Sequence, residues 1–141
     1  MNLNITMEVT SKNRYIEAVG RRKTATARVR ITPATKGSFI VNDKDVKDYF
    51  VTNELQTISQ EALAKSEIGE KFTVTVHVNG GGIHAQAEAV RHGLARTLVE
   101  RDEQVRNALK KLGFLKRDPR HVERKKFGLK KARKAPTWSK R

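Results

Sequence analysis

The residues best suited to chemistry in this chain are the adjacent cations of segment 20–24, Gly-Arg-Arg-Lys-Thr. Their order is similar to the end of a phosphate-binding loop. However, no glycine directly precedes Lys23, so the spacing G-x-x-x-x-G-K-[ST] is absent and nucleotide hydrolysis is not expected. Three neighbouring cations at a tight turn can instead bind the phosphates of a nucleic acid. A solvated basic turn is the plain alternative.

A second candidate for phosphate binding is the glycine triplet of residues 80–82, which opens a predicted helix. The free amides and the dipole at a helix N-terminus attract anions. The same glycines also suit a tight turn between a strand and a helix. The sequence leaves both interpretations open.

Catalytic and metal-binding patterns are not found. The histidines at 77, 84, 92 and 121 form no HExxH motif, and the chain has no Cys, so we expect no metal site and no cofactor. His92 follows Glu88 by four residues on one predicted helix, which suggests at most a surface pair. No serine lies in a context typical of an activated nucleophile. We therefore expect a protein that is not an enzyme.

The charge of the chain indicates a polyanionic partner. Thirty Lys and Arg against fifteen Asp and Glu give a net charge of +15, which is typical of proteins that bind RNA, DNA or an anionic membrane surface. No apolar run of about 18 residues predicts a transmembrane helix. Residues 1–13 have neither a basic start nor an apolar stretch, so a signal peptide is not expected.

The charge is concentrated at the C-terminal end. Residues 116–141 contain twelve Lys or Arg and two acids, a net charge of +10, and few apolar residues. Such a segment cannot bury enough apolar surface to fold alone. We expect three parts: an N-terminal extension (1–13), a globular domain (14–115) and an extended basic RNA-binding tail (116–141).

The elements that must position these residues follow from hydrophobic periodicity. Apolar residues alternate with polar ones in strand patterns, and helical patterns lie between and after the strands. The predicted strands are 15–19, 25–31, 38–41 and 72–78, with the basic turn 20–23 between the first two. Predicted helices start at Asn42-Asp43, cover 52–64, follow the glycines with Ile83, Ala87, Val90, Leu94 and Leu98 on one face, and run from Asp102 to Gly113. This order indicates an α+β domain.

Ten segments carry a further signal, and they are 15–29, 80–82, 86–87, 89–91, 93–96, 118–120, 123–126, Gly128, 130–134 and 139–141. In this order and spacing they resemble the small-subunit ribosomal protein nine family in its bacterial form. The chain departs from the family at His84-Ala85 and Glu88, where small residues and glycine are usual. It also departs near its end, where Thr137 and Trp138 keep an aromatic residue before Ser-Lys-Arg.

The resemblance implies a four-stranded mixed sheet with helices on one face, like the second domain of small-subunit ribosomal protein five, plus a long extended basic C-terminal tail. It implies a structural constituent of the head of the small subunit, in a cytoplasmic ribosome, with an organelle ribosome left open. The implied partners are small-subunit rRNA, neighbouring head proteins and P-site tRNA, whose anticodon stem-loop the end of the tail would contact. A membrane and a small-molecule substrate are not implied.

The expected site residues combine the exposed cations with these family positions. For rRNA they are Arg21, Arg22, Lys23, Arg28, Arg30, Arg91, Arg96, Arg117, Arg120, Arg124, Lys125, Lys126, Lys130, Lys131, Arg133 and Lys134. For tRNA they are Trp138, Ser139, Lys140 and Arg141. Trp138 lies among cations where no core can receive it, and an aromatic side chain there suits stacking on a base. The alternatives are a DNA-packaging protein, which the charge alone allows, and a metabolite kinase, which needs the missing phosphate loop.

Overall fold

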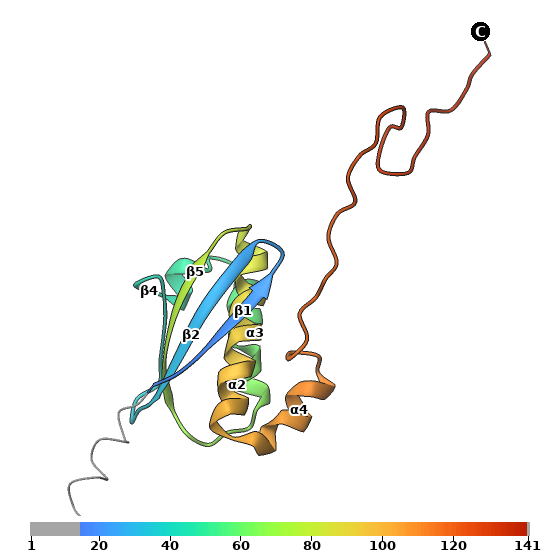
Figure 1. Cartoon of the computed structure of the whole chain (residues 1–141). Coiled ribbons are helices and arrows are strands. Elements are labelled where there is room, and N and C mark those ends of the chain that lie inside the picture. Colours follow the sequence, from blue (N-terminus) through green and yellow to red (C-terminus); the bar gives the residue numbers. More distant parts are fainter. Residues whose placement is uncertain (1–14, 141) are drawn as a thin grey trace, which may run out of the picture.

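The structure is a computed structural model, and it describes residues 15–140 (Figure 1). The predictions for residues 1–13 and for Arg141 lie outside this part of the chain. Five strands form one mixed sheet in the order β1-β2-β5-β3-β4. The strands are β1 (Ile16–Arg22), β2 (Ala25–Pro33), β3 (Ser38–Val41), β4 (Lys44–Asp45) and β5 (Phe72–Asn79).

The helices gather on one face of this sheet, as Figure 1 shows. They are α1 (Val46–Tyr49), α2 (Asn53–Lys65), α3 (Ile83–Arg101), the short 3-10 helix η1 (Glu103–Val105) and α4 (Arg106–Lys111). Helix α3 lies on β1 and β2, and α2 lies against α3. Neighbouring strands are antiparallel except β3 and β5, which are parallel. The predicted α+β class with a mixed sheet and helices on one face is confirmed.

Strands β2 and β5 build the core through the alternation that predicted them. Their buried positions are Ala25, Ala27, Val29, Ile31, Phe72, Val74, Val76 and Val78. The residues between them point to the other side of the sheet, because successive side chains of a strand face opposite ways. That second face carries Arg28 and Arg30 and is not covered by a helix within the described residues.

The fifth strand is the difference from the predicted four-stranded sheet. The sequence predicts a helix start at Asn42 and Asp43, but both residues have positive φ angles, 47° and 64°, and form the turn between β3 and β4. Two successive left-handed residues suit a two-residue hairpin because their twist matches that of the strands. The helix begins instead at Val46, after Asp45, whose side chain accepts a hydrogen bond from the backbone N of Lys47 at 3.0 Å.

The turn between β1 and β2 is shorter than the sequence predicts. Strand β1 continues through Gly20 to Arg22, which pairs with Ala25, so only Lys23 and Thr24 form the turn. Lys23 has a φ of 51°, in the left-handed region that such a turn requires. The prediction of residues 20–23 as the turn is wrong because Gly20 is needed for close contact with α3, not for a change of chain direction.

Helix α3 is buried over more than one stripe because it lies between the sheet and α2. Its buried residues are Ala85, Ala87, Ala89, Val90, Gly93, Leu94, Ala95, Thr97 and Leu98. Ile83, predicted to share one face with Ala87, Val90, Leu94 and Leu98, is 47% exposed at the start of the helix. Helix α2 begins and ends one residue later than the predicted 52–64.

The chain leaves its last helix through the predicted glycine cap. Gly113 has a φ of 78°, and its backbone N donates to the carbonyl O of Lys110 at 3.0 Å. The backbone N of Phe114 donates to the carbonyl O of Leu109 at 3.1 Å, which completes a Schellman motif. Phe114 is buried. The direction in which the chain leaves the domain is therefore set by a local cap and one buried ring.

Candidate nucleic-acid interface

The cations predicted as phosphate contacts in the body divide into two groups. Those with exposed side chains on the β1–β2 hairpin are Arg21, Lys23 and Arg28. Those whose guanidinium groups contact an acid or a backbone carbonyl at 2.8 Å or less are Arg22, Arg30, Arg91 and Arg96. The first group leaves its charge open to a partner, whereas the second also holds the fold together.

On the open face of the sheet, Glu17 lies between two arginines. It forms an ion pair with Arg30, and its Oε1 lies 4.0 Å from the Nε of Arg28. The Arg30 guanidinium also lies over the ring of Tyr15, 4.7 Å from its centroid. The hydrogen bond with Glu17 raises the pKa of Arg30. The Arg28 side chain is 49% exposed and that of Arg30 35%, so Arg28 is the more open of these two arginines to a phosphate.

The two arginines of α3 connect that helix to its neighbours. Arg91 Nη1 lies 2.8 Å from Oε2 of Glu61 on α2, and its guanidinium lies over the ring of Phe114 at 4.8 Å from the centroid. Arg96 Nη1 donates to the carbonyl O of Val19 at 2.5 Å, on the outer edge of β1. Both side chains therefore carry structural contacts in addition to their charge.

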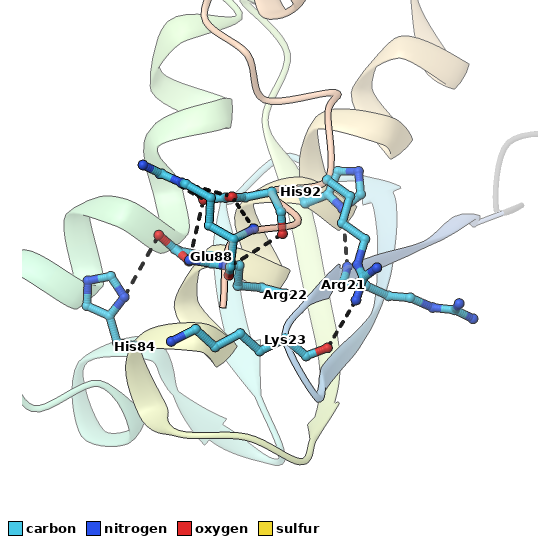
Figure 2. Close-up of polar contacts among 9 residues, drawn as sticks. Arg21, Arg22, Lys23, His84, Glu88 and His92 are labelled. Carbon is cyan, nitrogen blue, oxygen red and sulfur yellow. Dashed lines mark hydrogen bonds and ion pairs between the residues drawn. The ribbon is translucent and has the colours of Figure 1, made fainter. Parts of the chain in front are cut away.

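Arg22 lies at the centre of a polar cluster between β1, α3 and the start of the tail (Figure 2). Its Nε lies 2.5 Å from Oε2 of Glu88, and its Nη2 lies 3.3 Å from Oδ2 of Asp118. The Arg22 side chain is only 13% exposed. Glu88 also lies 3.9 Å from Nδ1 of His84. Its partners are therefore Arg22 and His84, whereas the sequence suggested a pair with His92.

His92 faces β1 instead. Its Nδ1 accepts a hydrogen bond from the backbone N of Arg21 at 3.2 Å, so this nitrogen carries no proton (Figure 2). Burial lowers the pKa of His92, and the nearby charge of Arg96 lowers it further, against opposing backbone contacts from Arg21 and Leu115. The neutral imidazole therefore accepts a backbone hydrogen bond of β1 beside the exposed Arg21 side chain.

The glycine triplet lies beside the basic turn. Gly80 has a φ of 77°, and a Cβ atom there would lie 2.6 Å from the carbonyl O of Thr24. The strand-to-helix turn therefore needs glycine for close approach to the β1–β2 turn. This contact favours the structural interpretation of the triplet and brings the start of α3 next to Lys23.

Beyond the domain, the tail extends away from the body (Figure 1). Almost all of its residues are exposed, including Phe127 at 99% and Trp138 at 80%. Its exposed cations are Lys116, Arg117, Arg120, Arg124, Lys125, Lys130, Lys131, Arg133, Lys134 and Lys140. Ser139 is exposed as well, while Arg141 lies outside the described residues. The tail thus presents a dense row of positive charges and two aromatic rings.

The tail is locally ordered around its second acid. Glu123 forms ion pairs with Lys126 and with Arg133, whose Nε lies 2.9 Å from its Oε2. These two cations, Lys126 first, lower the pKa of Glu123. The backbone N of Lys130 donates to the carbonyl O of Lys134 at 2.7 Å, which closes a loop in the chain. The tail is therefore extended as a whole but folded back over residues 123–134.

A comparison with protein families decides what this body and tail are. The family model described as ribosomal protein S9/S16 matches residues 20–141. The match covers the basic turn, α3 and the whole tail. This chain belongs to the ribosomal protein S9/S16 family.

As a member of the S9/S16 family, the chain is a structural constituent of the ribosome, a ribonucleoprotein that works in translation, and it binds rRNA. Such proteins are typically not enzymes. Within residues 15–140, no group of three or more His, Asp or Glu side chains is arranged to hold a metal ion. In the same part of the chain, no helix is long and apolar enough to span a membrane.

The sequence reasoning missed the acids that organise this S9/S16 surface. It suggested only a surface pair with His92 for Glu88 and no pairing for Glu17, Asp118 and Glu123, whereas each of the four acids pairs with one or more of the predicted site residues. The local signals were the short spacings from Asp118 to Arg120 and from Glu123 to Lys126. Arg22, which contacts both Glu88 and Asp118, is 66 and 96 residues away from them.

Proposed function

We propose that this protein is built into the head of the small ribosomal subunit, where its body binds rRNA and its tail reaches P-site tRNA. The observation that carries the proposal is the exposed basic tail that projects from a folded body (Figure 1). In a ribosome such a tail neutralises closely spaced phosphates that otherwise repel one another. We place this ribosome in the cytoplasm, with an organelle ribosome as the alternative.

The proposed rRNA contacts of the body come from the β1–β2 hairpin. Arg21, Lys23 and Arg28 have exposed side chains on this hairpin, and phosphate contacts of this kind fix the register of a protein on folded RNA. Arg30, Arg91 and Arg96 contribute charge from positions that are also tied to the fold. Neighbouring head proteins complete the surroundings of the body.

The proposed rRNA contacts of the tail are its cations from Arg117 to Lys134. They are Arg117, Arg120, Arg124, Lys125, Lys126, Lys130, Lys131, Arg133 and Lys134, all exposed except the half-buried Lys126. Fully extended, 26 residues span roughly 85–90 Å, which is ample for a tail that crosses from the outside of the head to the decoding side. The loop at residues 123–134 shortens this reach in the free protein.

The proposed tRNA contacts are the last four residues. Trp138 is exposed and suits stacking on a base or a ribose, and Lys140 and Arg141 supply charge for the anticodon stem-loop. Deletion of residues 139–141 is expected to leave subunit assembly intact and to weaken retention of P-site tRNA. Failure of the truncated chain to enter subunits contradicts this division between the body and the end of the tail.

The test of rRNA binding uses an rRNA transcript and its salt dependence. If six to ten phosphates are neutralised, affinity should fall by roughly 10³–10⁵ between about 50 and 200 mM salt. Replacing Lys130, Lys131, Arg133 and Lys134 with Gln should weaken binding and flatten the salt response. A matched control replaces four exposed lysines away from the proposed interface, Lys36, Lys44, Lys47 and Lys65, and should weaken binding much less.

The rival function is general DNA packaging, which predicts comparable affinity for duplex DNA. Sucrose-gradient sedimentation of a DNase-treated lysate separates the two. Comigration of the protein with small subunits and whole ribosomes supports the ribosomal proposal. Retention at the top of the gradient contradicts it.

A further inference from the structure

The first residues of the tail, 116–120, are fastened to the β1–β2 hairpin, and we term this segment the arm root. Arg22 Nη1 donates to the carbonyl O of Arg120 at 2.7 Å and to that of Asp118 at 3.4 Å. In the opposite direction, Arg117 Nη2 donates to the carbonyl O of Lys23 at 3.2 Å. Hydrogen bonds are thus given from each side to the backbone of the other, so that neither segment can turn freely.

Each nitrogen of the Arg22 guanidinium faces an acid or a backbone carbonyl. Its Nε faces Glu88 at 2.5 Å, its Nη1 faces two carbonyls of the arm root, and its Nη2 faces the carboxylate of Asp118 at 3.3 Å. Figure 2 shows Arg22 and Glu88 side by side in this cluster. The Arg22 side chain is 13% exposed and that of Glu88 22%. Little of the group is therefore open to a phosphate.

Arginine is required here because of its planar fork of five donors. A lysine has one compact charge and cannot reach an acid on α3 and the arm root on opposite sides at once. Asp118 also pairs with Arg120, whose Nη2 lies 2.8 Å from the same Oδ2 that faces Arg22. The pKa of Asp118 is lowered chiefly by the hydrogen bonds from Arg120, and the charge of Arg22 lowers it further. The carboxylate therefore stays ionised and keeps its place between the two arginines.

We propose that Arg22 is a positioning residue, which sets the direction of the basic tail through Glu88 and Asp118 and does not itself bind RNA. The inference rests on the proposed function of the tail as an RNA-binding arm. An arm root that is already ordered lowers the conformational entropy lost when the tail binds RNA. It also keeps the tail close to its RNA-binding site once the body has bound. Two of the chain's acids then promote RNA binding although they carry the same charge as RNA.

The sign of a charge effect makes this proposal testable. Glu88→Gln and Asp118→Asn each make the chain more positive by one unit, so simple electrostatics predicts tighter RNA binding. Loss of the positioning contact predicts weaker binding, by about tenfold. Arg22→Lys keeps the net charge, and it should weaken binding as much as Arg22→Gln, because neither residue supplies the fork.

The experiment measures the affinity of the full chain for a small-subunit rRNA transcript over a range of salt. Glu70→Gln is the matched control, since it also removes an acid from an ion pair, with Arg101, away from the arm root. We expect Glu88→Gln and Asp118→Asn to bind more weakly than the wild type and Glu70→Gln to bind equally or more tightly. The salt slope of all variants should stay at the wild-type value, because no phosphate contact is removed.

A second readout follows the free protein. Amide hydrogen exchange across residues 116–120 should become faster in Glu88→Gln and Asp118→Asn, while the exchange of β2 and β5 stays unchanged. Unchanged core exchange also shows that the variants fold, and these two variants keep the test valid if Arg22→Gln does not fold.

Three results overturn the proposal. One is tighter RNA binding by the Glu88 and Asp118 variants, as in the control. Another is wild-type affinity in Arg22→Lys together with a salt slope lowered by about one in Arg22→Gln, which identifies a direct phosphate contact. The third is unchanged exchange in the arm root. Failure of the proposed function itself looks different, because the wild-type protein then binds rRNA weakly and with a flat salt response while arm-root exchange still changes.

Discussion

Gly20 of β1 and Gly93 of α3 lie backbone against backbone. A Cβ atom on Gly20 would lie 2.2 Å from the N of Gly93 and 1.9 Å from the carbonyl O of Ala89. This close approach brings His92 to the backbone of Arg21 and Arg96 to the carbonyl of Val19. The two glycines therefore determine where the edge of the proposed RNA-binding surface meets the helix.

Gly20→Ala is expected to destabilise the domain by about 1–3 kcal/mol or more, because the added methyl group meets backbone atoms that cannot move aside. Urea unfolding of the full chain measures this change. Gly69→Ala is the control, since a Cβ atom at Gly69 would meet nothing within 4 Å and its φ is not in the left-handed region. Equal stabilities of the two variants would contradict the close contact.

Asn42 extends the pairing of β3 and β5 beyond the last strand residue. Its Nδ2 donates to the carbonyl O of Val78 at 2.9 Å, and the N of Val78 donates to its Oδ1 at 3.0 Å. Asn42→Ala leaves both backbone groups without this partner and should cost about 1–3 kcal/mol in unfolding free energy. Asp43→Gly, in the same turn at a φ of 64°, should be neutral or stabilising by up to about 1 kcal/mol. Equal losses in the two variants would show that the turn alone, and not the amide, is responsible.

His92 is expected to make stability depend on pH in a defined direction. Its pKa in the folded chain lies below the ordinary value of 6.5, so the unfolded chain takes up a proton first as the pH falls. The contribution of His92 is complete above about pH 6.5 and decreases below it. When the free energy of unfolding is measured at about pH 7.5 and about pH 5.5, its decrease between the two should be smaller for His92→Gln than for the wild type. An identical pH dependence in both proteins would contradict the lowered pKa.

Trp138 is the single tryptophan of the chain and reports on the end of the tail. Because its side chain is 80% exposed, its fluorescence should change little when the body unfolds. If it stacks on a base, its emission should be quenched by RNA. Trp138→Ala should then weaken binding by about 1–3 kcal/mol, whereas Trp138→Phe should keep most of the affinity because it keeps an aromatic face. Equal affinities of the alanine variant and the wild type would remove Trp138 from the interface.

Local features of this protein could be predicted from the sequence because they depend on neighbouring residues. The alternation from Ala25 to Ile31 and from Phe72 to Val78 places every second side chain in the core whatever the rest of the chain does. The cap at Gly113 and the exposed tail follow in the same way from residue type and charge. The family motifs were readable for the same reason, since they are short runs of adjacent residues.

Only the tertiary structure decided which side chains meet across long stretches of chain. Glu88 is four residues from both His84 and His92 on one helix, but its shortest ion pair is with Arg22, 66 residues away, because this part of α3 lies on β1. Gly20 is suited to a turn by its type, and its role in a close strand–helix contact exists only once Gly93 is opposite it. Sequence spacing fixes which face of an element a residue occupies, but not which faces are brought together. The cations of this chain could therefore be found from the sequence, while their division into exposed and fold-holding groups required the fold.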